Sequence, residues 1–312
     1  MHPPLSWALL FSLLMGCLFA QAQPSPEIPI ESLSQHPIRH LEVNDLEYYF
    51  IEKGEGDLIF FLHGFPDMAG TWDETISELS KDYRCVAPFL RGYYPTALPK
   101  DGDYSARSIA RDIDQIARKL GVEHYSVVGQ DWGALVTYAM ASLFPERVDK
   151  IATIAIPHPS CIRTTPATAY KARHFIRFRN QKKSPAYTRK DNFAYLDKLY
   201  TRWSPNWAAY TETADLIKRA YSLPGRLEAA LGYYWSLNQQ DKSQPDLYEK
   251  MPEMPWLALA GRTDGALPMG AFKRMEKRVE TPFWMVYHDE AGHFLHAEAP
   301  KFFVETLKAF LE

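Results

Sequence analysis

Residues 125–140 read YSVVGQDWGALVTYAM and combine two kinds of local pattern. The first residues are aromatic and β-branched, which favours a strand, whereas the residues after Gly133 are typical of a helix. Small residues at Gly129 and Gly133 bracket Asp131, as a sharp strand-to-helix turn requires. Because Asp is also a common helix N-cap, this stretch alone leaves Asp131 as either a cap or a nucleophile.

Short apolar runs lie along the chain on both sides of this turn. They predict strands at 46–51, 58–62, 84–89, 126–128, 151–156, 256–260 and 284–287. Helical spacings lie between several of them, which predicts an α/β fold with a mostly parallel sheet covered by helices. The alternation breaks after residue 156 and resumes near residue 256. We therefore expect a core domain of residues 23–156 and 250–312 and an inserted helical cap at 157–249.

The composition is that of a large globular protein. Of its 312 residues 46% are hydrophobic, and 35 Lys and Arg balance 38 Asp and Glu, so neither disorder nor nucleic-acid binding is indicated. With three cysteines the chain is not a disulfide scaffold, and a bond between Cys85 and Cys161 stays open. Every charged residue in the segment 163–190 is Lys or Arg. That segment is either a solvated face or a region that attracts an anionic substrate or surface.

The first 22 residues have the pattern of a secretory signal. Residues 7–18 are almost wholly apolar, and Ala20 and Ala22 place small side chains where a signal peptidase reads them. The run is shorter than the ~20 residues that span a bilayer, which disfavours a membrane anchor. We expect cleavage after Ala22 and a secreted or periplasmic protein. Lipoprotein anchoring through Cys17 is the alternative.

A second motif, HGFP at 63–66, directly follows the predicted strand at 58–62. In a parallel sheet this turn lies beside the turn that contains Asp131. The backbone N–H groups of Phe65 and Trp132 would then form an oxyanion hole.

His293 follows the last predicted strand and is the expected general base. The chain order nucleophile, acid, histidine requires a carboxylate between Asp131 and His293. Asp264, just after the predicted strand at 256–260, fits that position. The sequence therefore predicts a triad of Asp131, Asp264 and His293.

Together these motifs resemble the α/β-hydrolase superfamily, specifically its epoxide hydrolase and haloalkane dehalogenase branch. An aspartate that attacked an ester would form an unstable mixed anhydride, whereas attack on a saturated carbon forms an ordinary ester. The resemblance implies a substrate with an electrophilic sp³ carbon and a covalent alkyl ester on Asp131. A water activated by His293, which Asp264 orients, would hydrolyse that ester. The resemblance implies no cofactor and no metal.

Opening an epoxide releases a basic alkoxide, so an epoxide hydrolase needs proton donors in its cap. The stretch LGYYW at 231–235 resembles the family's second donor motif, which assigns this role to Tyr234, with Tyr233 as the alternative. His174 falls at the position of the first cap donor, which is a tyrosine in most of the family. A histidine there resembles a subgroup of secreted epoxide hydrolases that use a His/Tyr pair. A packing role for His174 is the other interpretation. The expected substrate-binding residues are Trp132, Phe65, Tyr233 and Phe175.

The preferred function is hydrolysis of an epoxide to a vicinal diol, with a small-molecule epoxide and water as partners. A haloalkane or haloacid dehalogenase with the same triad is the alternative, since Trp132 resembles a halide donor and Trp72 or Trp235 could supply a second one. The family's haloacid enzymes have Arg after the nucleophile, where this chain has Trp132. A non-catalytic binding protein is the third option, which the complete triad disfavours.

Overall fold

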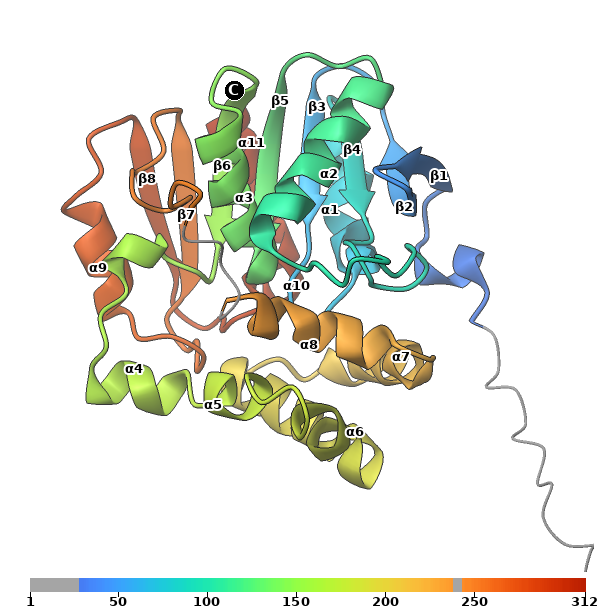
Figure 1. Ribbon diagram of the computed structural model, residues 1–312. Coiled ribbons are helices and arrows are strands. Elements are labelled where there is room, and N and C mark those ends of the chain that lie inside the picture. Colours follow the sequence, from blue (N-terminus) through green and yellow to red (C-terminus); the bar gives the residue numbers. More distant parts are fainter. Residues whose placement is uncertain (1–27, 238–242) are drawn as a thin grey trace, which may run out of the picture.

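The computed structural model describes residues 28–237 and 243–312, and its centre is one eight-stranded sheet (Figure 1). The strand order is β1-β2-β4-β3-β5-β6-β7-β8, and all pairs from β4 to β8 are parallel. The strands are β1 (Ile38–Val43), β2 (Leu46–Lys53), β3 (Leu58–Leu62), β4 (Arg84–Pro88), β5 (Tyr125–Gln130), β6 (Val148–Ile154), β7 (Trp256–Gly261) and β8 (Phe283–His288). The predicted α/β architecture is confirmed.

The antiparallel hairpin of β1 and β2 was not predicted in full, because only β2 has a clear apolar run. β1 is an edge strand whose side chains are mostly exposed or half-buried. Asn44 and Asp45 form the turn, with φ angles of 48° and 62°. Asn and Asp tolerate such left-handed conformations, which suit two-residue hairpin turns.

Helices cover both faces of the sheet, which explains why β3 and β7 are buried along their whole length. α2 packs against α3 and α1 packs against α11, and the two pairs lie on opposite sides of the sheet (Figure 1). The core helices are α1 (Asp73–Leu79), α2 (Ala106–Lys119), α3 (Trp132–Leu143), α9 (Gly270–Glu276), α10 (Leu295–Glu298) and α11 (Pro300–Leu311). Short 3₁₀ helices are η2 (Ile30–Leu33), η3 (Ala69–Trp72) and η4 (Pro159–Cys161).

The chain between β6 and β7, called the lid below, forms a helical layer across one end of the sheet (Figure 1). Its helices are α4 (Pro166–Lys171), α5 (His174–Phe178), α6 (Ser184–Trp203), α7 (Tyr210–Ser222) and α8 (Arg226–Ser236). α6 is interrupted by non-helical backbone at residues 190–193. β5 ends at Gln130 and α3 begins at Trp132, so the turn at Asp131 lies at the carboxyl end of β5. The lid covers this same end of the sheet (Figure 1).

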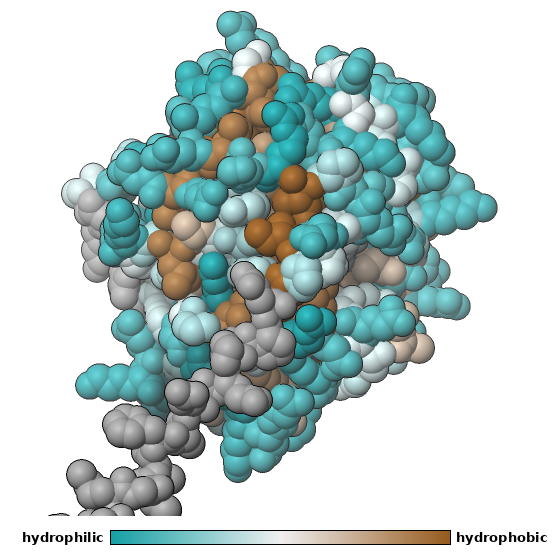
Figure 2. Space-filling view, turned by 90° about the vertical axis from the view of Figure 1, so that its right-hand side faces the viewer, coloured by the Kyte–Doolittle hydropathy of each residue, from teal (hydrophilic) through white to brown (hydrophobic). Residues whose placement is uncertain are grey.

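The predicted leader, with Cys17, lies outside the described residues. Within 28–237 and 243–312, no helix is long and apolar enough to cross a membrane. Cys85 and Cys161, whose pairing the sequence left open, are both free and buried. The face shown in Figure 2 is mostly hydrophilic, with hydrophobic side chains exposed in a narrow strip between polar ones.

Candidate active site

The turn between β5 and α3 holds Asp131 in a strained backbone conformation. Its φ of 51° and ψ of −116° are unusual for a residue with a side chain. A Cβ on Gly129 would lie 2.2 Å from the carbonyl oxygen of Gly133, and a Cβ on Gly133 would lie 2.0 Å from that of Leu62. Only glycine fits at these two positions, so the small residues noted in the sequence are required by close backbone packing.

The structure brings the three predicted triad residues together at the carboxyl ends of β5, β7 and β8. Nε2 of His293 lies 3.2 Å from Oδ2 of Asp131, and Nδ1 of His293 lies 3.0 Å from Oδ2 of Asp264. The other carboxylate oxygen of Asp264 accepts a hydrogen bond from the backbone N–H of Ala266 at 2.5 Å. Asp264 and His293 are almost wholly buried, whereas Asp131 keeps 8% of its surface exposed.

His293 is held between two carboxylates, and this controls its charge. Burial by itself would lower the pKa of His293. The negative charge of Asp264 and the hydrogen bonds with Asp131 and Asp264 outweigh burial and raise the pKa of His293 to about 10. In the free protein near neutral pH, His293 is therefore an imidazolium paired with the Asp131 carboxylate.

The predicted oxyanion-hole turn lies against Asp131. The backbone N–H of Phe65 donates to Oδ1 of Asp131 at 2.9 Å, leaving Oδ2 to His293. His63 braces the turn, because its Nε2 accepts a hydrogen bond from the backbone N–H of Leu90 at 3.1 Å. The backbone N–H of Trp132, at the first residue of α3, remains the predicted second donor.

Both predicted lid donors lie in an aromatic cluster above Asp131. The rings of His174 and Tyr234 are 5.9 Å apart, and Tyr234 also packs edge-on against Phe65 at 5.4 Å. Burial, followed by the charge of Asp131, raises the pKa of Tyr234 well above its usual value. Burial, followed by the positive charge of Arg202, lowers the pKa of His174 well below its usual value. Tyr234 is thus a neutral phenol and His174 a neutral imidazole.

The remaining predicted substrate-binding residues divide into two groups. Phe175 is half-buried with its ring 5.1 Å from that of Tyr234, and Trp132 packs edge-on against Tyr234 at 5.0 Å. Tyr233, in contrast, donates its hydroxyl hydrogen to the backbone oxygen of Arg91 at 2.9 Å. The hydroxyl group of Tyr233, the alternative lid donor, is therefore already hydrogen-bonded in a contact between the lid and the core.

Two residues at the site are not among the predicted site residues. The ring of Trp203, at the end of α6, lies 4.8 Å from the rings of both His174 and His293, and its backbone oxygen accepts the N–H of His293 at 3.0 Å. Asp67, directly after the HGFP motif, is buried, and burial raises its pKa to about 8. Asp67 could have been found from the sequence, because it directly follows the HGFP motif. Trp203 could not, because it lies in a lid helix that contains no recognisable motif.

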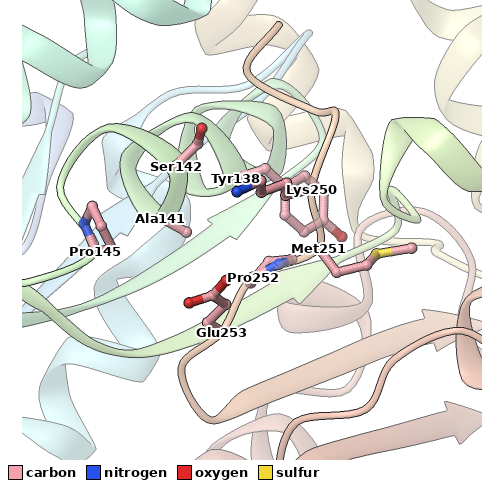
Figure 3. A pocket seen from close by; sticks show the side chains of 8 residues that line it. All are labelled: Tyr138, Ala141, Ser142, Pro145, Lys250, Met251, Pro252 and Glu253. Atoms are coloured by element: carbon pink, nitrogen blue, oxygen red, sulfur yellow. The ribbon is translucent and has the colours of Figure 1, made fainter. Parts of the chain in front are cut away.

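Among the pockets on the surface of the described residues, two lie beside α3. One, of about 250 Å³, lies between the second half of α3 and residues 250–253, and Tyr138 and Glu253 are among its lining residues (Figure 3). The other, of about 610 Å³, has Trp132 in its wall, with residues from 101–111, 236–237 and 244–248. The second pocket adjoins the candidate active site through Trp132. In the described part of the chain, no group of three or more His, Cys, Asp or Glu residues is placed to hold a metal ion.

Residues 57–300 match the family described as alpha/beta hydrolase fold. The chain belongs to this family. This α/β-hydrolase is 30% identical over 268 residues to the AB hydrolase superfamily protein YfhM of Bacillus subtilis (strain 168), covering 83% of this chain and 92% of the relative. It is 28% identical over 285 residues to Epoxide hydrolase 1 of Caenorhabditis elegans, covering 88% of this chain and 70% of that protein.

Among solved structures, the Bacillus megaterium epoxide hydrolase in complex with an inhibitor matches this α/β-hydrolase with a TM-score of 0.76 and 26% identity. The match covers 88% of this chain and 99% of that one. The predicted membership of the epoxide hydrolase branch is confirmed. The pairing of His174 with Tyr234 as lid donors stays a prediction.

Proposed function

We propose that this α/β-hydrolase is an epoxide hydrolase that forms a covalent ester on Asp131. The observation that carries the proposal is a carboxylate at the turn after β5, 3.2 Å from a histidine and beneath the neutral phenol of Tyr234. A carboxylate nucleophile suits attack on a saturated carbon, and a phenol suits donation to the alkoxide that leaves. The names of the relatives from Caenorhabditis elegans and Bacillus megaterium agree with this chemistry.

In the first half-reaction, Oδ2 of Asp131 attacks a ring carbon of the epoxide. The carbon–oxygen bond of the ring breaks, and Tyr234 gives its phenol proton to the new alkoxide while His174 hydrogen-bonds to it. The proton that the imidazolium of His293 loses once the ester has formed restores the phenol by way of solvent, so one proton is taken up here and returned to His293 in the second half-reaction. The product of this step is an alkyl ester of Asp131 with a neighbouring hydroxyl group. Burial keeps both lid donors neutral, so each retains a hydrogen to donate near neutral pH.

In the second half-reaction, water attacks the carbonyl carbon of that ester. Nε2 of His293 takes the proton of the water, and the N–H groups of Phe65 and Trp132 stabilise the oxyanion that forms on Oδ1. Ester formation removes the negative charge of Asp131, one of the groups that raises the pKa of His293. The imidazole thereby becomes easier to deprotonate and ready to act as a base. Collapse of the intermediate releases the diol and regenerates the Asp131 carboxylate.

One contact bears on the dehalogenase alternative. The indole N–H of Trp235 donates to the backbone oxygen of Phe178 at 2.7 Å, so it is engaged within the lid. The indole of Trp72 packs against His296 at a ring distance of 4.2 Å, and its N–H is buried without a hydrogen-bond partner among the described residues. The contact of Trp235 therefore disfavours it as a second halide donor, whereas the N–H of Trp72 is not engaged, and the adduct test below decides between the two reactions.

The test uses the variant His293→Gln, which retains the nucleophile and loses the base. After incubation with terminal epoxides and, separately, haloalkanes, intact mass and peptide mapping report the adduct. We expect a mass increase equal to the whole epoxide, located on Asp131, because the ring oxygen stays with the alkyl group. An adduct from haloalkanes alone, lighter than the reagent by hydrogen halide, would establish the dehalogenase. The absence of both adducts would favour a binding protein.

The predicted leader indicates the compartment in which the proposed enzyme acts. We propose that it is exported, to the periplasm or the medium, and acts there on a small-molecule epoxide and water without a cofactor. Anchoring through a lipidated Cys17 is the alternative. The mass of the mature protein purified from its host distinguishes cleavage after Ala22 from lipidation of Cys17.

A further inference from the structure

One surface of the lid is strongly cationic, although the whole chain has a formal charge of -3. The segment 163–190 contains nine Lys or Arg residues and neither Asp nor Glu. Lys171 and Arg173 are half-buried, and Lys171 donates to the backbone oxygen of Leu267 in the core. The other cations of the segment are exposed, and they are Arg163, Arg177, Arg179, Lys182, Lys183, Arg189 and Lys190. The exposed side chains of residues 163–190 are called the basic lid face below.

The protein itself neutralises little of this charge. Among the described residues, Arg189 is the one exposed cation of the face that forms an ion pair, with Glu228. That pair is itself partly exposed, so water screens it strongly. A concentration of like charges without acidic partners attracts an anionic surface from outside the protein.

Large hydrophobic side chains are exposed on the same face. Tyr170 on α4 is 69% exposed, Ile176 on α5 is 62% exposed, and Tyr187 on α6 is 37% exposed. They are three of the six large hydrophobic side chains that are exposed in the described part of the chain, so half of these gather in this one segment. Arg173 stacks over the ring of Tyr170 at 4.3 Å. Arg177 lies over the ring of Tyr187 at 4.7 Å, so cations and apolar groups alternate on this face.

The helices of the basic lid face have a different side toward the candidate active site. On α5, His174 and Phe178 are four residues apart and buried on one side of the helix. Ile176 and Arg177 lie between them in sequence and are exposed. α4, α5 and α6 lie on the side of the lid that faces away from the sheet (Figure 1). A large partner can therefore reach the basic lid face without entering the active site.

The surface of an anionic lipid bilayer matches both properties of this face. Its negatively charged headgroups attract Lys and Arg, and aromatic and aliphatic side chains enter the boundary between headgroups and acyl chains. A polyanion such as heparin or a nucleic acid would also attract the cations. Its charged backbone, however, would give the exposed side chain of Ile176 no apolar contact.

We propose that the basic lid face binds the surface of membranes that contain anionic phospholipids. The side chains of Tyr170, Ile176 and Tyr187 would enter the headgroup region, while the cations contact lipid phosphates. The proposal concerns the outer side of the lid and does not depend on the epoxide hydrolysis proposed for its inner side.

Co-sedimentation with phosphatidylcholine vesicles, with and without phosphatidylglycerol, tests the role of charge. We expect at least about tenfold tighter binding when phosphatidylglycerol is present, and weaker binding as the salt concentration rises. Combining Lys182→Gln with Lys183→Gln should lower the affinity about tenfold. Combining Lys119→Gln with Lys301→Gln removes the same charge from exposed positions of the core and should preserve the affinity. Equal binding to both kinds of vesicle, or equal loss in both double variants, would overturn the proposal.

A fluorescent label tests whether the apolar side chains enter the membrane. The variant Ile176→Cys, labelled with an environment-sensitive fluorophore, should shift its emission to shorter wavelength on vesicles with phosphatidylglycerol. The labelled variant Lys119→Cys is the control and should show no shift. Cys85 and Cys161 are buried, and the unmodified protein treated in the same way measures the background. The same emission from both labelled variants would contradict the proposal.

Heparin distinguishes a membrane from a general polyanion. Ile176→Ser should weaken binding to anionic vesicles several-fold and leave binding to heparin unchanged, because heparin offers only charge. If Ile176→Ser left vesicle binding unchanged, the face would bind polyanions and the membrane proposal would be wrong. An anchor elsewhere in the chain, such as a lipidated Cys17, would hold all variants on the vesicles alike. That result would equally rule out the basic lid face as the membrane-binding surface.

Discussion

Tyr233 and Tyr234 are consecutive residues of α8, yet their hydroxyl groups have different surroundings. Tyr233 donates to the backbone oxygen of Arg91, whereas the phenol of Tyr234 lies near enough to Asp131 for that carboxylate to raise its pKa. The first residue joins the lid to the core, and the second belongs to the site.

This difference predicts different effects of removing each hydroxyl group. Tyr234→Phe should slow formation of the ester on Asp131 by about 10²-fold, because the alkoxide loses a proton donor. Tyr233→Phe should mainly lower the free energy of unfolding, by about 1 kcal/mol for the lost hydrogen bond. Single-turnover mass spectrometry and urea unfolding measure the two effects. If Tyr233→Phe slowed ester formation more than Tyr234→Phe, the assignment of the donor would be reversed.

A second prediction concerns Asp264, which accepts a hydrogen bond from Nδ1 of His293. Asp264→Asn should lower kcat by about 10⁴-fold, since the histidine loses the negative charge and the orientation that make it a base. The ester on Asp131 should still form and then accumulate. The exposed Asp289, which pairs with Arg262, supplies the control Asp289→Asn. Rapid-quench mass spectrometry checks the result, and a variant that formed no ester would show that Asp264 acts earlier.

The charge of His293 should make stability depend on pH. Its pKa is about 10 in the folded protein against the ordinary value of 6.5 in the unfolded chain, so folding binds a proton between these values. This contribution is fully present below pH 6.5 and is lost as the pH rises toward 10. We expect the difference in unfolding free energy between the unmodified protein and His293→Gln to fall by a few kcal/mol over that range.

Urea unfolding at several pH values measures this difference. Asp67, whose pKa is raised to about 8, titrates in the same range, and the charge of His293 lowers the pKa of Asp67. The comparison is therefore made with Asp67→Asn present in both proteins, which removes this contribution. A difference that stayed constant from pH 6.5 to 10 would mean that His293 is neutral in the folded protein.

A fourth prediction tests the packing of the turn at Asp131. A methyl group on Gly133 would lie 2.0 Å from the backbone oxygen of Leu62, which cannot move without distorting β3. Gly133→Ala should therefore destabilise the protein by several kcal/mol. Gly270→Ala is the matched control, because its Cβ would meet only the flexible side chain of Arg274 at 3.5 Å. Thermal unfolding of both variants checks the expectation, and equal melting temperatures would contradict it.

Much of the fold was predictable because buried parallel strands are continuous apolar runs. Each predicted strand overlaps one of the observed strands from β2 to β8. The edge strand β1 was missed, since an exposed strand such as Ile38–Val43 lacks that signal. The helices of the lid were not resolved individually, because their packing depends on aromatic contacts that sequence spacing does not reveal.

The site was predictable to the extent that its residues follow strands. Asp131, Asp264 and His293 follow the strands β5, β7 and β8, which all run in the same direction. The carboxyl ends of parallel strands lie at the same end of the sheet, so the three residues lie there too. Trp203 follows no strand and belongs to no motif. Its position depends on how α6 packs onto the core, which no local pattern in the sequence specifies.

The insertion of the lid after β6 separates two kinds of residue along the chain. The groups proposed to hydrolyse the ester all lie in the core, on its loops or at the start of α3, whereas those proposed to receive the epoxide oxygen lie on the inserted helices. Changes in the inserted helices can therefore alter which molecules are accepted while the ester-cleaving residues stay the same. A change of substrate specificity can therefore arise from mutations confined to one contiguous segment of the gene.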